Sequence, residues 1–242
     1  MNNQEIKDCL NNGNKLLLDE IEKMLPVRFE VWDENYYAGK ISMKEGCGVV
    51  YCKPDMHQAK IAHELLHIKT GYLLGDNKIM LVRARQSMNP LSIMIITEAL
   101  CEGLLNQTEH SLFFEDYMAM GYKAVDFFES MKLQVEADLW KDTIIKNGIG
   151  KGGTYSTTEI YSYLAVLILF LLYPVKGQYN HQYKKISKAI PELANAMERF
   201  VGRLQTISIT STDRNKMQST YEALASDIIK WLDNSKVIPS FY

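Results

Sequence analysis

The feature that most constrains this chain is the pentapeptide at residues 63–67, which reads His-Glu-Leu-Leu-His. Side chains four positions apart on an α-helix lie one turn apart on the same face. A helix here therefore brings His63 and His67 together, where two imidazoles can bind one metal ion. Glu64 is rotated by about 100° from His63, so it can hold a metal-bound water without being a ligand itself.

The residues around this motif favour a helix that buries one of its sides. Four apolar residues fall on the side opposite to the histidines: Ala59, Ala62, Leu65 and Leu66. Such a face packs into a protein core, and Gly71 is the expected helix stop. The alternative is a solvated helix face that carries two histidines, because short motifs also occur by chance.

Composition places the chain among ordinary globular proteins. It has 242 residues, 47% hydrophobic and 23% charged, which is enough for a substantial core. Its net charge of −2 gives no reason to expect nucleic acid or an anionic membrane as a partner. The first residues lack the features of a signal peptide, so we expect a cytoplasmic protein. The longest apolar run, residues 163–173, is too short to cross a membrane and predicts a buried helix, with a membrane-associated segment as the alternative.

The four cysteines suggest neither secretion nor a zinc framework. Their spacing, at Cys9, Cys47, Cys52 and Cys101, matches no zinc ribbon, so we expect reduced thiols. Cys47 and Cys52 flank a predicted strand and could be neighbours. A second metal site there would need two further ligands, and the sequence offers no candidates for them.

Three short strands are predicted before the motif. Residues 27–31 alternate between apolar and other residues, and residues 36–43 and 48–52 are two further strand segments separated by polar turns. They predict a small antiparallel sheet. Helices are predicted through most of the remaining sequence, so the expected fold is α+β and mostly α. Residues 72–90 have no clean period and are expected to form a loop that binds substrate or acts as a lid.

A zinc site needs at least one more protein ligand, and the next predicted helix, Leu91 to Met120, offers candidates. His110 is the first choice, because imidazole is a common zinc ligand. Glu109 is the alternative third ligand and would give a His-His-Glu set. A solvated polar stripe is the other interpretation of this helix face. The residues that share an arc of about 120° on this face are Glu98, Glu102, Asn106, Glu109, His110 and Phe113.

The order of a small sheet followed by a helix with His-Glu-x-x-His resembles the zincin metallopeptidases. In that superfamily an edge strand aligns an extended peptide beside the metal, a part that residues 48–52 would play here. The segment Asn-Gln-Thr-Glu-His at residues 106–110 is similar to the second helix of bacterial and phage proteins loosely grouped as IrrE N-terminal-like. There an Asn and, one turn later, an Asp or His face the site, which implies roles for Asn106 and His110. The E-x-x-A-N-x-F-A segment usual in that group is absent.

The resemblance implies a zinc-dependent metallopeptidase, a hydrolase acting on a protein or peptide substrate. His63, His67 and His110 (or Glu109) would hold Zn²⁺, and a metal-activated water would attack the peptide carbonyl with Glu64 as general base. A regulatory protein is a more fitting substrate than bulk protein. A catalytically weak zincin-like binding or regulatory module is the alternative function.

The predicted domain organisation follows from the motif. Residues 1–122 are expected to form the zincin-like metallopeptidase domain, and residues 123–242 a helical extension packed on it or one continuous domain with it. The glycine-rich residues 148–153 lack the ending of a phosphate-binding loop. His57 and His181 are expected to lie away from the site. The sequence leaves the oligomeric state open.

Overall fold

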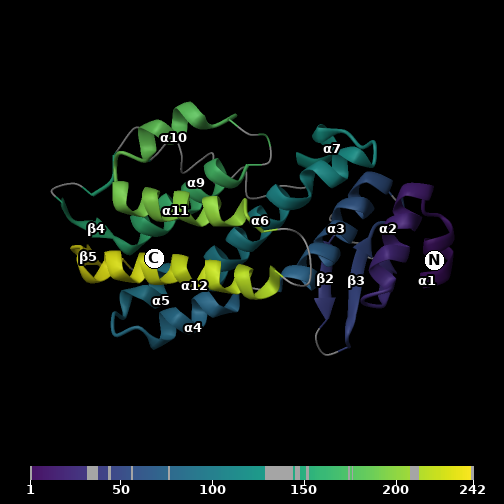
Figure 1. Cartoon of the computed structure of the whole chain (residues 1–242), viewed down its shortest axis with the longest axis horizontal. Coiled ribbons are helices and arrows are strands. Elements are labelled where there is room, and N and C mark those ends of the chain that lie inside the picture. The colour runs from purple at the N-terminus through teal and green to yellow at the C-terminus, as the bar shows by residue number, and fades with distance from the viewer. Residues whose placement is uncertain are drawn as a thin grey trace. The chain divides into compact units, whose positions relative to one another are not determined.

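The computed structural model describes most of the chain (Figure 1). The chain divides into two compact units. The first unit comprises Met1–Leu73 and Leu112–Lys132, and the second comprises Leu74–Ser111 and Leu133–Tyr242. These limits differ from the boundary expected after residue 122, and they leave the predicted functional division untested. The described residues are 2–31, 38–42, 45–55, 57–75, 77–128, 144, 148–150, 153–173, 175, 177–207 and 213–240.

The first unit holds a three-stranded sheet, made of β1 (Val27–Val31), β2 (Ala38–Ser42) and β3 (Cys47–Cys52). The strand order is β1-β3-β2, with β3 antiparallel to β2 and parallel to β1. The prediction of an antiparallel sheet is therefore wrong, because β1 runs parallel to β3. The prediction that residues 48–52 form an edge strand is wrong because β3 lies between β1 and β2. The outer residues of the predicted strand 36–43 lie outside the described part.

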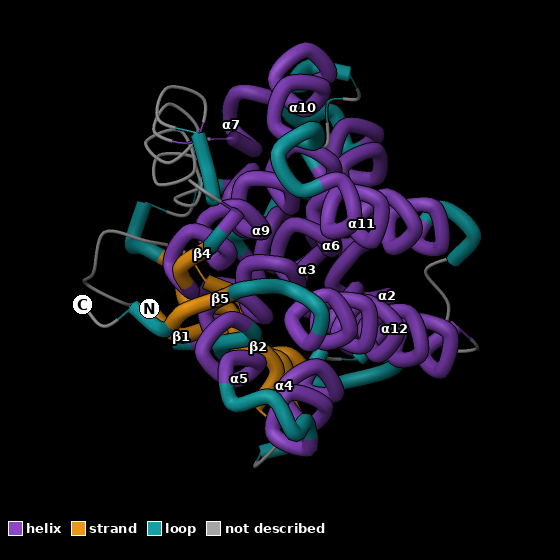
Figure 2. The backbone as a smooth tube through the Cα atoms, turned by 90° about the vertical axis from the view of Figure 1, so that its left-hand side faces the viewer, coloured by secondary structure: helices purple, strands orange, loops and turns teal. Residues whose placement is uncertain are grey.

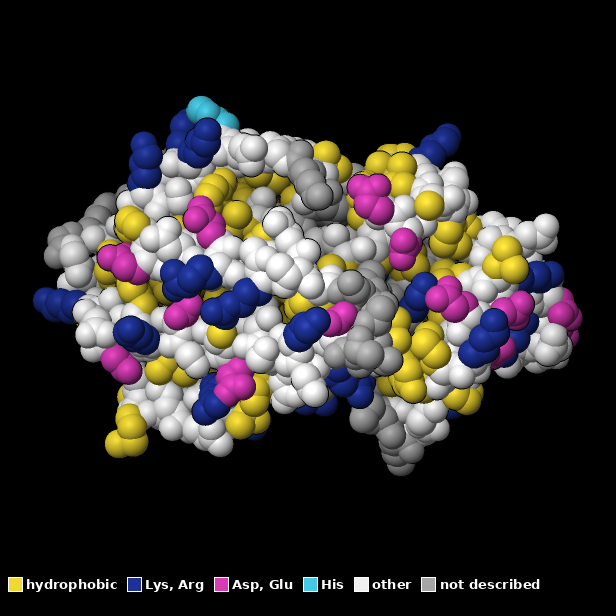
Figure 3. All heavy atoms as spheres, viewed as in Figure 1, with side chains coloured by type: hydrophobic (Ala, Val, Ile, Leu, Met, Phe, Trp, Pro, Cys, Tyr) yellow, Lys and Arg dark blue, Asp and Glu magenta, His cyan; other side chains and the backbone are white. Residues whose placement is uncertain are grey.

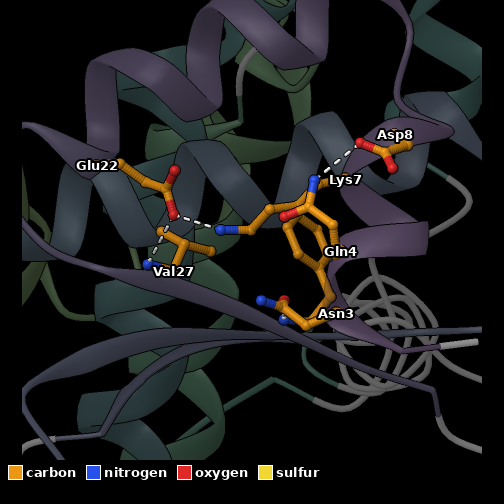
Figure 4. A network of polar contacts seen from close by, with 7 residues as sticks. Asn3, Gln4, Lys7, Asp8, Glu22 and Val27 are labelled. Atoms are coloured by element: carbon orange, nitrogen blue, oxygen red, sulfur yellow. Dashed lines mark hydrogen bonds and ion pairs between the residues drawn. The ribbon is translucent and has the colours of Figure 1, made fainter.

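Two helices precede the sheet, α1 (Asn3–Asp8) and α2 (Asn12–Glu22). A polar network ties them to β1 (Figure 4). Lys7 pairs with Glu22 at 2.6 Å, and the same Glu22 carboxylate accepts the backbone N–H of Val27 at 3.4 Å. Asn3 accepts the backbone N–H of Phe29 through its side-chain oxygen at 2.8 Å. The helices thus satisfy backbone groups of β1 and fix where that strand begins.

Helix α3 (Gln58–Leu74) carries the histidine motif. Its apolar residues Ala59, Ala62, Leu65 and Leu66 are buried, as the sequence predicts. The predicted stop at Gly71 is wrong, since a helix interior tolerates glycine at a cost of about 1 kcal/mol. The helix ends instead before Gly75, whose φ of +78° lies in the left-handed region that favours glycine.

The segment expected to be a loop contains a helix. Residues 78–86 form α4 (Lys78–Gln86), so the prediction of a loop over residues 72–90 is wrong. The long helix predicted next is divided into α5 (Leu91–Ile95) and α6 (Glu98–Ala119). Thr97 accepts the backbone N–H of Leu100 through its hydroxyl at 3.2 Å, which caps the new helix. The division between the two units passes through α6 after Ser111.

The second unit is built around α9 (Thr157–Leu172), which the apolar run predicted. Eleven of its 16 residues are buried, so α9 is enclosed on nearly every side. It packs against α5, α10 (Asn180–Ile186) and α11 (Pro191–Leu204), while α12 (Arg214–Asp233) lies against α11, α4 and α5 (Figure 1). Within the described residues, every helix falls short of the length and apolar character that a membrane crossing needs.

A small second sheet fixes the start of α9. Strand β4 (Tyr155–Ser156) pairs in parallel with β5 (Val237–Ile238), and Figure 2 shows the two side by side. Ser240 follows β5 and accepts the backbone N–H of Thr158 through its hydroxyl at 3.1 Å. The backbone N–H of Ser240 donates to the Thr157 hydroxyl at 3.0 Å. The first turn of α9, which Ser156 and Glu159 cap locally, is therefore also bonded to Ser240, more than 80 positions later in the sequence.

Ion pairs on the surface of the second unit connect its helices. Arg199 on α11 contacts Asp227 on α12 at 2.8 Å, and Arg83 on α4 contacts Glu222 on α12. Over the face drawn in Figure 3, Lys and Arg side chains are interspersed with Asp and Glu. This pattern agrees with the small net charge of −2.

Candidate metal centre

The two motif histidines lie side by side on α3. Their Nε2 atoms are 3.0 Å apart, and their ring centroids are separated by 4.8 Å. Two nitrogens that each bind a tetrahedral zinc at 2.0–2.1 Å lie about 3.3 Å apart. The separation of His63 and His67 is therefore close to that of a chelating pair. The helical spacing of four residues produces this geometry directly.

The structure brings a third histidine to this pair. His110 on α6 forms a group with His63 and His67 in which the nearest ligand atoms all lie within 4.8 Å of one another. These three side chains could hold a metal ion. Glu109, the alternative third ligand, is buried but does not belong to the group. Whether His110 or Glu109 acts as the third ligand stays a prediction.

Burial sets the charge state of His63. The side chain of His63 is only 2% exposed, so the interpretation of the motif as a solvated helix face is wrong. Burial, reinforced by the neighbouring His67, holds the pKa of His63 well below its ordinary value. A neutral imidazole is the form that binds a metal ion. His63 is therefore in the protonation state that coordination requires.

The carboxylate of Glu64 is held by the edge strand β2. The backbone N–H of Gly39 donates to Oε2 of Glu64 at 2.6 Å. A Cβ at position 39 would overlap the backbone carbonyl oxygen of Glu64 and lie 3.0 Å from its carbonyl carbon, so only glycine fits this approach. The sequence analysis missed Gly39. A glycine inside a predicted strand is the signal of a close backbone approach that could have found it.

Aromatic rings surround the histidine pair. The ring of Phe113 meets His67 edge-on at 4.9 Å and His63 at 5.5 Å between centroids. Tyr117 lies 6.2 Å from His63, and Phe127 on α7 (Ala124–Phe128) lies 4.7 Å from it. Of these rings, the sequence analysis placed only Phe113 on the site face. Tyr117 continues that face one turn later, at i+4, which a helical wheel could have shown.

The polar stripe predicted on α6 divides into two parts. Glu98 and Glu102 are exposed, as a solvated stripe would be, whereas Glu109 and His110 are buried. Gln107 is buried as well, and within the described part of the chain neither of its amide atoms has a hydrogen-bond partner. The exposed half of the stripe thus needs no functional explanation, and the buried half does.

The remaining candidate residues lie apart from this cluster. His57 and His181 are both exposed, as the sequence analysis expects. Cys47 and Cys52 are the first and last residues of β3, so they are not neighbours. The four cysteines are free thiols. Burial raises the pKa of the Cys52 thiol to about 11 and that of Cys101 to about 12.

Comparisons with known proteins add nothing to this geometry. No protein-family model matches the chain, and neither the curated proteins nor the solved structures contain a match. The resemblance to the zincins therefore rests on the motif and the order of elements alone.

Proposed function

We propose that this chain is a zinc-dependent metallopeptidase that hydrolyses peptide bonds with Glu64 as its general base. The observation that carries the proposal is the group of His63, His67 and His110, whose ligand atoms lie within 4.8 Å of one another. Catalytic zinc sites have three protein ligands and keep a fourth position for water, whereas structural sites are closed by four. Three imidazoles next to a motif carboxylate fit the catalytic type.

The donor set is chemically suited to zinc. Imidazole nitrogen is a ligand of borderline softness that zinc shares with copper and nickel. The lowered pKa of His63 keeps its ring neutral and able to coordinate at neutral pH. Zinc is proposed among these metals because a glutamate between two histidine ligands serves hydrolysis and has no use in electron transfer.

The chain's own groups supply the proton transfers. Bound zinc contributes Lewis acidity, which lowers the pKa of a ligated water to about 7 and polarises a carbonyl. Glu64 takes a proton from the attacking water and passes it to the leaving amide nitrogen. The Gly39 N–H, bonded to Oε2 at 2.6 Å, stabilises the ionised carboxylate and fixes its direction.

The sheet offers a track for an extended peptide. In the described part of the chain, β2 pairs only with β3, and its Gly39 touches Glu64. A peptide strand can add to a sheet edge through main-chain hydrogen bonds. A substrate bound along β2 would pass beside Glu64, which supports a protein or peptide as the substrate.

A binding or regulatory module is the second candidate function. The observation that favours it is burial, because His63 and His110 are each only 2% exposed. A site enclosed to this extent holds a metal for structural purposes as readily as for catalysis. The two functions therefore differ in whether Glu64 has chemistry to perform.

Metal content distinguishes the ligands. We expect about one zinc per wild-type chain by inductively coupled plasma mass spectrometry, as one set of three ligands predicts. His110→Ala should lose it, whereas His181→Ala, which removes an exposed histidine, should not. Glu109→Ala should keep it, like the exposed control Glu102→Ala. Loss of zinc in Glu109→Ala alone would identify the Glu109 carboxylate as the third ligand.

Hydrolysis distinguishes the two functions. Glu64→Gln should keep its zinc and lose activity on a mixed peptide library by a factor of about 10²–10⁴, the usual contribution of a general base. A wild-type protein that holds zinc but cleaves no peptide supports the binding module. A wild-type protein that holds no zinc after mild purification refutes the peptidase.

A further inference from the structure

Within residues 121–127, α7 is attached to the first unit through the buried side chain of Phe127. Among residues 121–127, only Phe127 is buried, and the others are exposed or half-buried. Val125, on the same helix, is 59% exposed. The ring of Phe127 is therefore the main apolar attachment of this stretch.

That ring lies among aromatic side chains and against His63. Its centroid lies 4.7 Å from that of His63 and 4.9 Å from that of Phe114. Tyr117 and Phe113 lie at 5.0 and 5.8 Å, both edge-on. These separations are those of favourable aromatic contacts. Phe127 thus lies against His63 together with Phe113 and Tyr117.

On its N-terminal side, α7 follows a glycine turn and an anchored tyrosine. Helix α6 ends at Ala119, and Gly121 follows it with a φ of +86°, which only glycine adopts readily. Tyr122 is tied down, since its hydroxyl is bonded to Asn11 and Asn14 at 2.9 Å each. Helix α7 begins two residues later and has five residues, too few to be stable by themselves. Among residues 121–127, the Phe127 ring is therefore the main contact that holds it in place.

A peptidase must bring a peptide carbonyl to its metal, yet His63 is 2% exposed beneath this ring. We propose that Phe127 is a removable plug, which in the resting chain fills the place that a large apolar side chain of the peptide substrate takes beside His63. This inference rests on the proposed peptidase function. Three rings that already enclose a phenylalanine provide contacts for an aromatic or bulky aliphatic side chain and none for a charged one. The site accordingly selects peptides with a large apolar residue near the cleaved bond.

Histidine modification tests whether Phe127 covers the site. The full-length chain, freed of metal by a chelator, is treated with diethyl pyrocarbonate, and each histidine is followed by peptide mass spectrometry. Modification of His63 should be about tenfold faster in Phe127→Ala than in wild type, because the covering ring is gone. Val125→Ala, which alters an exposed residue of α7, should react like wild type. The exposed His57 and His181 serve as references in every variant.

A small probe tests what the vacated place accepts. N-acetylphenylalanine amide should slow modification of His63 in Phe127→Ala at least about fivefold at millimolar concentration, because it restores the aromatic contacts. N-acetyllysine amide should give no protection. Equal modification of His63 in Phe127→Ala and wild type, or equal protection by the two probes, overturns the proposal.

Hydrogen exchange on wild type covers the case in which Phe127→Ala does not fold, as judged by circular dichroism. A plug that leaves its place exposes the amides of Asp126 and Phe127, so they should exchange at least about 100-fold faster than the α6 amides near Phe113. Exchange of both helices at one common rate overturns the proposal. None of these readouts needs zinc, so a chain without zinc refutes the peptidase function while the plug is judged separately.

Discussion

Helices α3 and α9 are both enclosed within their units, but they bury different kinds of side chain. Helix α9 encloses mainly aliphatic and aromatic residues. Helix α3 encloses His63 and Glu64 among its apolar residues. Burying apolar surface stabilises a fold by roughly 25 cal/mol per Å². Burying an ionisable group costs free energy unless another group compensates it.

The comparison distinguishes α9, whose sequence serves stability, from α3, whose sequence needs a further explanation. The sequence of α9 is explained by the stability of the second unit alone. The sequence of α3 is not, since apolar residues at positions 63 and 64 would fill the same space at lower cost. The neutral state of His63 and the hydrogen bond from Gly39 to Glu64 reduce that cost. A bound metal ion is the compensation that the proposed function adds.

The largest effect on stability is expected in α9. Leu167 is fully buried, so Leu167→Ala should lower the free energy of unfolding by about 2–5 kcal/mol, measured by urea denaturation. Leu16→Ala, at a leucine that is 71% exposed, is the matched control and should change it by less than about 0.5 kcal/mol. Zinc content per folded chain should stay unchanged in both. Loss of zinc in Leu167→Ala would show that metal binding on α3 depends on the packing of α9.

Metal removal should lower the free energy of unfolding through the histidine site on α3. With free zinc at about 1,000 times its dissociation constant, binding stabilises the folded chain by about 4 kcal/mol. A chelator should therefore lower the free energy of unfolding of wild type by that amount. The variant His110→Ala should be insensitive to the chelator. A chelator effect of equal size in both proteins would show that the metal acts elsewhere.

An intermediate effect on stability is expected from Cys101, because burial raises the pKa of its thiol from 9.0 to about 12. The folded chain keeps this thiol protonated while the unfolded chain ionises, so the contribution is complete below pH 9 and is lost as pH rises towards 12. The slope in this window is about 1.4 kcal/mol per pH unit. Chemical denaturation of wild type and Cys101→Ala at pH 8 to 11 measures it. A parallel pH dependence of the two proteins would contradict the prediction, and Cys9→Ala, at an exposed thiol, should match wild type.

The smallest effect is expected at the surface of the second unit. The pair of Arg199 and Asp227 is 52% and 31% exposed, so it is screened by solvent. Arg199→Ala should lower the free energy of unfolding by less than about 1 kcal/mol, and 1 M salt should reduce the difference further. A loss as large as that of Leu167→Ala would mean that the second unit depends on its surface pairs rather than on α9.

The site was predictable from the sequence as far as it depends on helix geometry. The contact between His63 and His67 follows from their spacing, because one turn of α3 fixes it. The choice between His110 and Glu109 did not follow, since adjacent residues on α6 differ only by about 100° of rotation. That rotation is set by the packing of the rings at positions 113 and 117. Gly39 was missed because its role depends on β2 meeting α3, which no local pattern encodes.

The fold was predictable in its elements and not in their pairing. The strand at residues 27–31 shows a clear alternation, but its parallel pairing with β3 depends on β2 lying on the other side. The break before α6 carried a readable signal in Thr97, a helix-capping residue placed before Glu98. The end of α3 did not, because Gly71 and Gly75 look alike in the sequence and differ only in backbone conformation.

The cap on α9 has a consequence for the order of events during synthesis. The Thr158 N–H donates to Ser240 and the Thr157 hydroxyl accepts from it, and Ser240 leaves the ribosome more than 80 residues after them. Translation proceeds at about 5–20 residues per second, so the first turn of α9 waits several seconds for its partner. During that interval the start of α9 has its local cap from Ser156 and Glu159 but not its contacts with Ser240. The start of this helix therefore reaches its full set of hydrogen bonds only after Ser240 has been synthesised.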